Sequence, residues 1–216
     1  MEPYAIDVNR LVNDIKGYIA QLKSTYFENN DPIDDNEIVL QKLCVKLETA
    51  LRNGMRDKFS FLGMRKDYWN FIAECLPKDE GVRYVNSLSQ LNTVQGKGRA
   101  LIRYCLVQKT LADTIQRTLM HRRKTEWYTP DALLTNSSLS AALIAKLYDL
   151  NELEFHLSCT GCDLDMSWPS FGRSFTDGYE KRTRKNSAGS IISTTDFTNE
   201  RTDPLISLNA EISALK

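Results

Sequence analysis

Histidine and cysteine are the residue types with which this sequence could build a catalytic or metal site. The only histidines are His121 and His156, so an active site that depends on imidazole would have to use one of them. His156 starts the segment HLSCTGC, in which Cys159 and Cys162 have the CxxC spacing of half a zinc site. The other three cysteines fall singly on apolar helical positions, and a redox CxxC would need a thioredoxin-like βαβ context. We therefore expect no metal site, and we interpret the cysteines as reduced, mostly buried thiols of a cytosolic protein.

Gly96, Lys97, Gly98 and Arg99 form a short segment that could be mistaken for a phosphate-binding loop. A Walker loop requires GxxxxGK followed by Ser or Thr, and a dinucleotide fingerprint requires a preceding strand; the sequence has neither. It also has no nucleophile elbow and no HExxH helix. We therefore predict that the protein is not an enzyme and binds no cofactor. The two glycines instead permit close backbone approach and a sharp bend where a long helix begins.

Charge is unevenly distributed along a chain whose 28 basic and 28 acidic side chains cancel. Residues 97–124 carry eight basic side chains and one acid, Asp113, which gives a local balance of +7. Residues 28–37 carry five acids and no base. The neutral total argues against nucleic acid as a partner, whereas separate basic and acidic faces suit a protein partner that is steered electrostatically.

Three cations, Lys97, Arg99 and Arg103, occupy the first turns of the helix predicted after the glycines. The helix dipole disfavours positive charge at this end. Their presence indicates either an acidic partner protein or an acidic salt-bridge partner within the domain, and the sequence leaves both open. Lys97 and Arg99 lie off the apolar stripe of this helix, so we expect that reversing both to glutamate leaves the fold intact.

Apolar residues recur at the three- and four-residue spacing of helices, and glycine and proline are sparse. This spacing predicts an all-α bundle of seven to nine helices that ends near Phe175. Thr129 followed by Pro130 resembles a helix cap with a first-turn proline, and Ser137 or Ser138 could cap the last expected helix. The expected helices span about 8–26, 39–51, 68–76, 82–85, 98–123 and 139–150, and a further short one begins at Pro130.

Six large aromatic side chains lie near predicted helix ends, where such residues usually anchor a bundle core rather than bind a ligand. They are Tyr68, Trp69, Phe71, Trp127, Tyr128 and Trp168. We therefore predict a structural role for this aromatic cluster.

The composition changes after the predicted bundle. Ser, Thr, Asn and basic residues dominate residues 176–204, which predicts a disordered linker. Residues 205–216 have the heptad spacing expected at the start of a coiled coil. We therefore divide the chain into a domain over 1–175, a linker and a coiled-coil onset. Because no stretch reaches the roughly 18 apolar residues of a membrane span, and the N-terminus lacks signal-peptide features, we expect an intracellular protein.

Five collinear segments resemble the signature blocks of the RUN domain family, and within it the RUN-and-FYVE group. The most specific is GKGRALIRYCLVQKTLADTI, in which a glycine–basic–glycine–arginine turn opens a long helix. The others are LCVKLETALRNGMR, FLGMRKDYWNFI, WYTPDALL and CDLDMSWPSF. The resemblance extends over about residues 5–175.

This resemblance implies an all-helical, non-enzymatic adaptor. RUN domains are associated with small GTPases of the Rab, Rap and Arf-like classes and with motor machinery, so kinesin or dynein components are further candidate partners. The related proteins imply transport of late endosomes, lysosomes and autophagosomes along microtubules. The resemblance also implies a cytoplasmic protein whose association with membranes is indirect, and a dimer formed through a downstream coiled coil.

The residues that we expect to bind the partner are the cations of the signature helix, with two more from the second block. They are Lys97, Arg99, Arg103, Lys109, Arg52 and Arg56. Such a surface would pair with acidic residues of a GTPase and give salt-dependent binding. Two alternatives remain open: the same cations could contact anionic lipid headgroups, or the domain could be purely architectural.

Overall fold

Eight α-helices make up most of the part of the chain that the structure, a computed structural model, describes, namely residues 6–159 and 164–166. They are α1 (Val8–Asn29), α2 (Ile38–Arg52), α3 (Tyr68–Cys75), α4 (Glu80–Ser87), α5 (Val94–Val107), α6 (Leu111–Leu119), α7 (Lys124–Trp127) and α8 (Ser137–Leu147). A short 3-10 helix, η1 (Tyr148–Glu152), follows α8. Two strands of two residues, β1 (Ile33–Asp34) and β2 (Phe155–His156), pair in parallel and are too short to give a sequence pattern. The prediction of an all-α bundle with seven to nine helices is confirmed for these residues.

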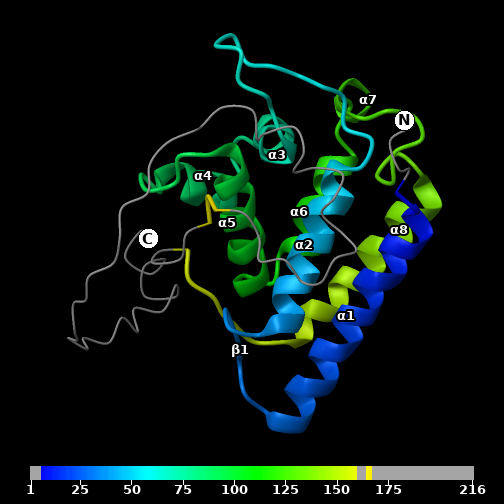
Figure 1. Ribbon diagram of the computed structural model, residues 1–216, viewed down its shortest axis with the longest axis vertical. Helices are drawn as coiled ribbons and strands as arrows, with labels where there is room; N and C mark the ends of the chain where they lie inside the picture. The colour runs from blue at the N-terminus through cyan, green and yellow to red at the C-terminus, as the bar shows by residue number, and fades with distance from the viewer. Residues whose placement is uncertain (1–5, 160–163, 167–216) are drawn as a thin grey trace, which may run out of the picture. The chain divides into compact units, whose positions relative to one another are not determined.

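The longest helix, α1, packs along α2 and α8, as Figure 1 shows. Asp7 begins it, because its side chain accepts a hydrogen bond from the Arg10 backbone N–H at 3.1 Å. Asn30 ends it in the left-handed conformation. The buried residues follow the helical repeat predicted from the sequence: Leu11, Val12, Ile15, Ile19 and Leu22.

The segment expected to be one helix over 98–123 is two helices, because the chain turns between α5 and α6. Lys109 adopts a left-handed conformation with φ of 58°. Its N–H bonds the Leu106 carbonyl at 3.2 Å, and the Thr110 N–H bonds the Cys105 carbonyl at 2.8 Å. These two bonds form a Schellman motif, which normally has glycine at this position. Because lysine stands there instead, the sequence carries no stop signal.

Two expected helix caps are wrong. No α-helix begins at Pro130, because Thr129 is used elsewhere: its N–H and its hydroxyl both bond the Gly54 carbonyl, at 2.8 and 3.2 Å. α8 is capped one residue earlier than expected, by Asn136, whose side chain accepts from the Leu139 N–H at 3.0 Å.

The aromatic cluster fills the space between α3 and the α7 region. The ring of Phe71 lies 5.6 Å from that of Trp127 and 5.1 Å from that of Tyr128, centre to centre. Tyr68 and Trp69 are buried as well, so the predicted structural role is confirmed for these five residues. The sixth, Trp168, lies outside the described residues, as do the expected bundle end, linker and coiled-coil onset.

None of the described helices combines the length and apolar character needed to cross a membrane.

Candidate functional site

The glycine–basic–glycine–arginine segment lies within the first turns of α5 rather than before the helix. Thr93 caps the helix by accepting a hydrogen bond from the Gly96 N–H at 2.9 Å. A Cβ atom at Gly96 would lie 2.0 Å from a carboxylate oxygen of Asp165, and one at Gly98 would lie 2.4 Å from the ring of Tyr68. Both glycines are therefore required because neighbouring side chains pack directly on the α5 backbone.

Asp165 fixes residues 164–166 against the start of α5. Its carboxylate accepts from the Thr93 hydroxyl at 2.5 Å, from the Thr93 N–H at 3.2 Å and from the Asn92 N–H at 2.9 Å. Although partial burial opposes the charge, these hydrogen bonds lower the pKa of Asp165 below its ordinary value. Asp165 therefore binds the exposed backbone N–H groups that precede the helix.

Arg99 is a buried structural residue, with 3% of its surface exposed. Its Nε donates to Glu48 Oε1 at 2.9 Å, and Glu48 is itself 2% exposed. A second guanidinium nitrogen of Arg99 donates to the Leu164 carbonyl at 3.0 Å and to the Met166 carbonyl. The hydroxyl of Tyr68 donates to Glu48 at 3.0 Å. Of the two interpretations left open by the sequence, the acidic salt-bridge partner within the domain therefore holds for Arg99. Reversing the charge of Arg99 would place two carboxylates side by side.

Arg52 completes this buried network from the end of α2. It lies 3.2 Å from Glu48 and 2.6 Å from Asp67, whose two oxygens also accept from its Nε. Burial opposes the charge of Arg52, but the hydrogen bonds to Asp67 and the charge of Glu48 raise its pKa overall. Asp67 also caps α3. We call Glu48, Arg52, Asp67, Tyr68 and Arg99 the buried joint, because together they connect α2, α3 and α5.

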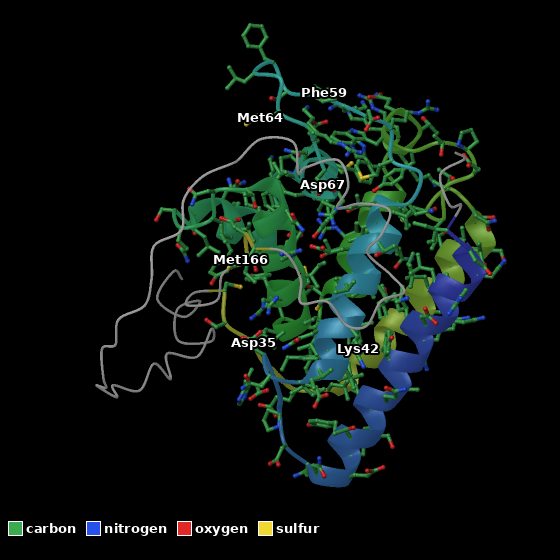
Figure 2. All side chains as sticks on the ribbon, viewed as in Figure 1. Asp35, Lys42, Phe59, Met64, Asp67 and Met166 are labelled. Atoms are coloured by element: carbon green, nitrogen blue, oxygen red, sulfur yellow. The ribbon has the colours of Figure 1, made fainter. Side chains whose placement is uncertain are left out.

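Arg103 makes a second connection, farther along α5. Its side chain is 8% exposed and bonds Asp35, with Nε and a terminal nitrogen 3.1 and 2.8 Å from Oδ1. The other oxygen of Asp35 accepts from the Ser158 N–H at 2.9 Å. Figure 2 shows Asp35 beside β1 and Asp67 beside α3, so the two acids serve different parts of the fold. Arg103 thus fixes the strand pair to the helix.

The six cations predicted to bind a partner do not form one surface. Arg99, Arg103 and Arg52 are held by carboxylates inside the domain. Lys97 is half-buried in the first turn of α5, and Lys109 is exposed after its last turn. The ten residues of α5 that follow Lys97 rise by about 15 Å before the turn that carries Lys109. Arg56 is exposed and follows α2.

Arg56 lines an open pocket that the sequence pattern does not indicate. The pocket has a volume of about 380 Å³. The Arg56 N–H bonds the Trp127 carbonyl at 2.8 Å, and its Nε donates to the Tyr128 carbonyl at 3.2 Å. The lining residues are Arg56, Lys124, Thr125, Tyr128, Pro130 and Thr135. The sequence does contain one indirect indication of this pocket: the GMR end of the block LCVKLETALRNGMR and the block WYTPDALL both belong to the family pattern, and the fold brings them together here.

Metal binding and thiol reactivity depend on how histidine, cysteine and acidic side chains are placed among the described residues. Among them, no three histidine, cysteine or acidic side chains are grouped as metal ligands would be. Cys159 is buried, and Cys162 lies outside the described residues. Burial raises the pKa of Cys44 to about 12 and that of Cys105 to about 11, so both remain protonated thiols at neutral pH.

Comparison with known proteins agrees with the resemblance in the signature blocks. The chain is 36% identical over 197 residues to human FYVE and coiled-coil domain-containing protein 1, covering 86% of this chain and 13% of that protein. It is 34% identical over 186 residues to human RUN and FYVE domain-containing protein 4, covering 82% of this chain and 33% of that protein. The chain therefore spans a third or less of the length of these relatives. The RUN domain family profile matches residues 42–161, which include α5 and the buried joint, and the chain belongs to the RUN domain family.

Proposed function

We propose that this RUN domain is a non-enzymatic adaptor that docks a small GTPase of the Rab or Arf-like class. The domain would thereby link late endosomes, lysosomes or autophagosomes to kinesin or dynein components and to transport along microtubules. Family membership supports the adaptor role, since RUN domain proteins are adaptors and effectors in vesicle trafficking. The relatives named above carry FYVE domains in addition, which supports a cytoplasmic position at endosomal membranes.

The observation that carries the docking proposal is the exposed Arg56 beside Lys124 in one open pocket. Arg56 is fixed by two hydrogen bonds to the α7 region, one from its backbone N–H and one from its Nε. Its terminal guanidinium nitrogens take no part in these two bonds and can bind a carboxylate in bidentate fashion. Fixed cations of this kind suit the acidic surface of a partner and give association that weakens with salt. Arg56 therefore fits the docking role best among the six predicted cations.

The experiment is a pull-down of the whole 216-residue chain against Rab and Arf-like GTPases, each loaded with GDP or a GTP analogue. With the best binder, Arg56→Glu should lower affinity by about 10-fold or more at low salt. The matched control is Arg83→Glu, since Arg83 is also an exposed arginine but lies on α4, and it should bind like the wild type. Lys97→Glu and Lys109→Glu test the two ends of α5.

The outcomes separate the candidate functions. Equal affinity of the Arg56→Glu and Arg83→Glu variants would contradict docking at this pocket. If only Lys97→Glu or only Lys109→Glu lowers the affinity for the GTPase, the docking surface lies at that end of α5 instead. A domain that binds none of the GTPases, and whose binding no charge reversal alters, would support the architectural alternative instead.

A further inference from the structure

The segment between α2 and α3 forms a hairpin with its own hydrogen bonds. Phe59 and Arg65 form a bridge, and the Lys66 N–H bonds the Lys58 carbonyl at 2.8 Å. Within the turn, the Ser60 N–H bonds the Met64 carbonyl at 2.7 Å. Figure 1 shows this segment extending beyond α3, away from the helices. The turn of the hairpin is therefore held by its own backbone hydrogen bonds.

The side chains of this hairpin reverse the usual distribution of polarity. We define the apolar tip as Phe59, Phe61, Leu62 and Met64, of which Phe59 and Met64 are labelled in Figure 2. Their exposed fractions are 61%, 104%, 78% and 61%, in that order. Single exposed apolar residues are common in soluble proteins, but four within six positions of one projecting turn form a patch that water solvates poorly.

The base of the hairpin is positively charged. Residues 58–66 contain Lys58, Arg65 and Lys66 and no acid. The ammonium groups of the two lysines lie over the ring of Trp127, 4.8 and 5.6 Å from its centre. These cations are thus held behind the apolar tip rather than among its side chains. Two of these cations have acidic partners: Arg65 lies 2.8 Å from Asp57, and the Lys66 ammonium lies 2.8 Å from Glu74 of α3.

We propose that the apolar tip inserts into the interface of an anionic membrane, with Lys58 and Arg65 contacting the headgroups. Apolar side chains outermost and cations behind them match the order of layers met on approaching a bilayer, in which acyl chains lie beneath anionic phosphates. A protein partner fits less well. Four side chains of a convex turn expose a few hundred Å² at most, whereas a stable protein interface covers about 800 Å² on each side.

This membrane contact is independent of the GTPase docking proposal, because it uses residues 58–66 and not Arg56. It also differs from lipid binding by the basic face of α5, since Arg99 and Arg103 on that helix are buried against Glu48 and Asp35.

The test measures vesicle flotation of the whole chain without any GTPase. Vesicles of phosphatidylcholine alone are compared with vesicles containing 30% phosphatidylserine, a composition chosen for the experiment. We expect binding to the anionic vesicles that weakens with salt, and a loss of about 10-fold or more in the Phe61→Ser, Leu62→Ser double variant. The matched control is Phe27→Ser, because Phe27 is also 61% exposed but lies at the end of α1, and it should bind like the wild type.

A second readout places the tip in the bilayer. A nitrobenzoxadiazole dye attached at Phe61→Cys should brighten with anionic vesicles, as the dye leaves water. Unchanged flotation of the double variant, no binding of the wild type to anionic vesicles, or a dye that stays dim would overturn the proposal. So would a double variant with normal melting that loses GTPase binding in the absence of vesicles, because the tip would then be a protein-docking element.

Discussion

Arg52 and Arg56 lie four residues apart, yet they belong to opposite kinds of surface. Arg52 is enclosed in the buried joint with Glu48 and Asp67, and Arg56 is exposed beside an open pocket. Just beyond Arg56, the apolar tip carries phenylalanine and leucine into solvent. In the buried joint, charged side chains are enclosed, whereas in the apolar tip apolar side chains face the solvent. Neither charge nor hydrophobicity alone therefore identifies the functional surface of this domain.

The cause of this difference is the number of elements that meet at each place. Three helices converge on Glu48, so its carboxylate is surrounded by donors: Arg52, Arg99 and Tyr68. A buried charge is tolerated only with such partners. Within residues 6–159 and 164–166, no other element meets the hairpin at its turn (Figure 1), and the side chains there are exposed. The following predictions test this contrast, beginning with the largest effect.

Reversal of Arg99 should unfold or severely destabilise the domain. Arg99→Glu places a second carboxylate against Glu48 in a site with little access to water, and breaking a buried pair costs about 3–5 kcal/mol. The matched variant Lys97→Glu changes the same charge two residues away, at a half-buried position, and should alter stability by no more than about 1 kcal/mol. Urea unfolding of both variants measures this. Similar midpoints for the two would show that the buried joint does not carry stability.

This result would also correct the expectation that reversal of both residues leaves the fold intact. The sequence places Arg99 off the apolar stripe, which is true of α5 in isolation. Its partner Glu48 lies 51 positions earlier in the chain, on another helix, and no local spacing reveals that contact. The helices themselves were predictable because their stripes are local, as in α1 and α2.

Other features depended on backbone geometry that residue types only weakly encode. The turn at Lys109 uses a left-handed conformation without glycine, and Thr129 bonds Gly54 rather than capping a helix. The apolar tip was inside a recognised block, FLGMRKDYWNFI, but a run of apolar residues does not by itself indicate whether it is buried. The exposure of this run can therefore be seen in the folded structure but not in the sequence pattern.

Adding one methyl group to the buried joint should be costly. The Cβ of Gly98→Ala would lie 2.4 Å from the ring of Tyr68, which is fully buried and cannot move without disturbing Glu48. Overpacking of this kind costs about 1–3 kcal/mol. Gly17→Ala is the control, because Gly17 lies within α1 with open space at its Cβ, and it should gain about 0.5–1 kcal/mol. The melting temperatures of the two variants test this. Equal changes in melting temperature would mean that α5 and α3 do not pack as described.

Alkaline pH should weaken the interior through Cys44, which is buried in α2 beside the joint. Burial raises its pKa from 9.0 to about 12, with Arg103 and Glu48 acting in opposite directions. In the unfolded chain this thiol ionises near pH 9, while in the folded chain it keeps its proton. The folded state therefore binds more protons above pH 9, so stability is fully present below that pH and falls as pH rises towards 12.

At pH 10 this difference amounts to about 1.4 kcal/mol for one thiol, since one pKa unit corresponds to 1.36 kcal/mol. Cys44→Ala should start less stable because of its cavity, but it should lose about 1.4 kcal/mol less than the wild type between pH 8 and pH 10. Urea unfolding at the two pH values measures the change. If both proteins lose the same free energy of unfolding, Cys44 has the same pKa in the folded and the unfolded chain. Water would then reach the interior beside Glu48 as it reaches the apolar tip.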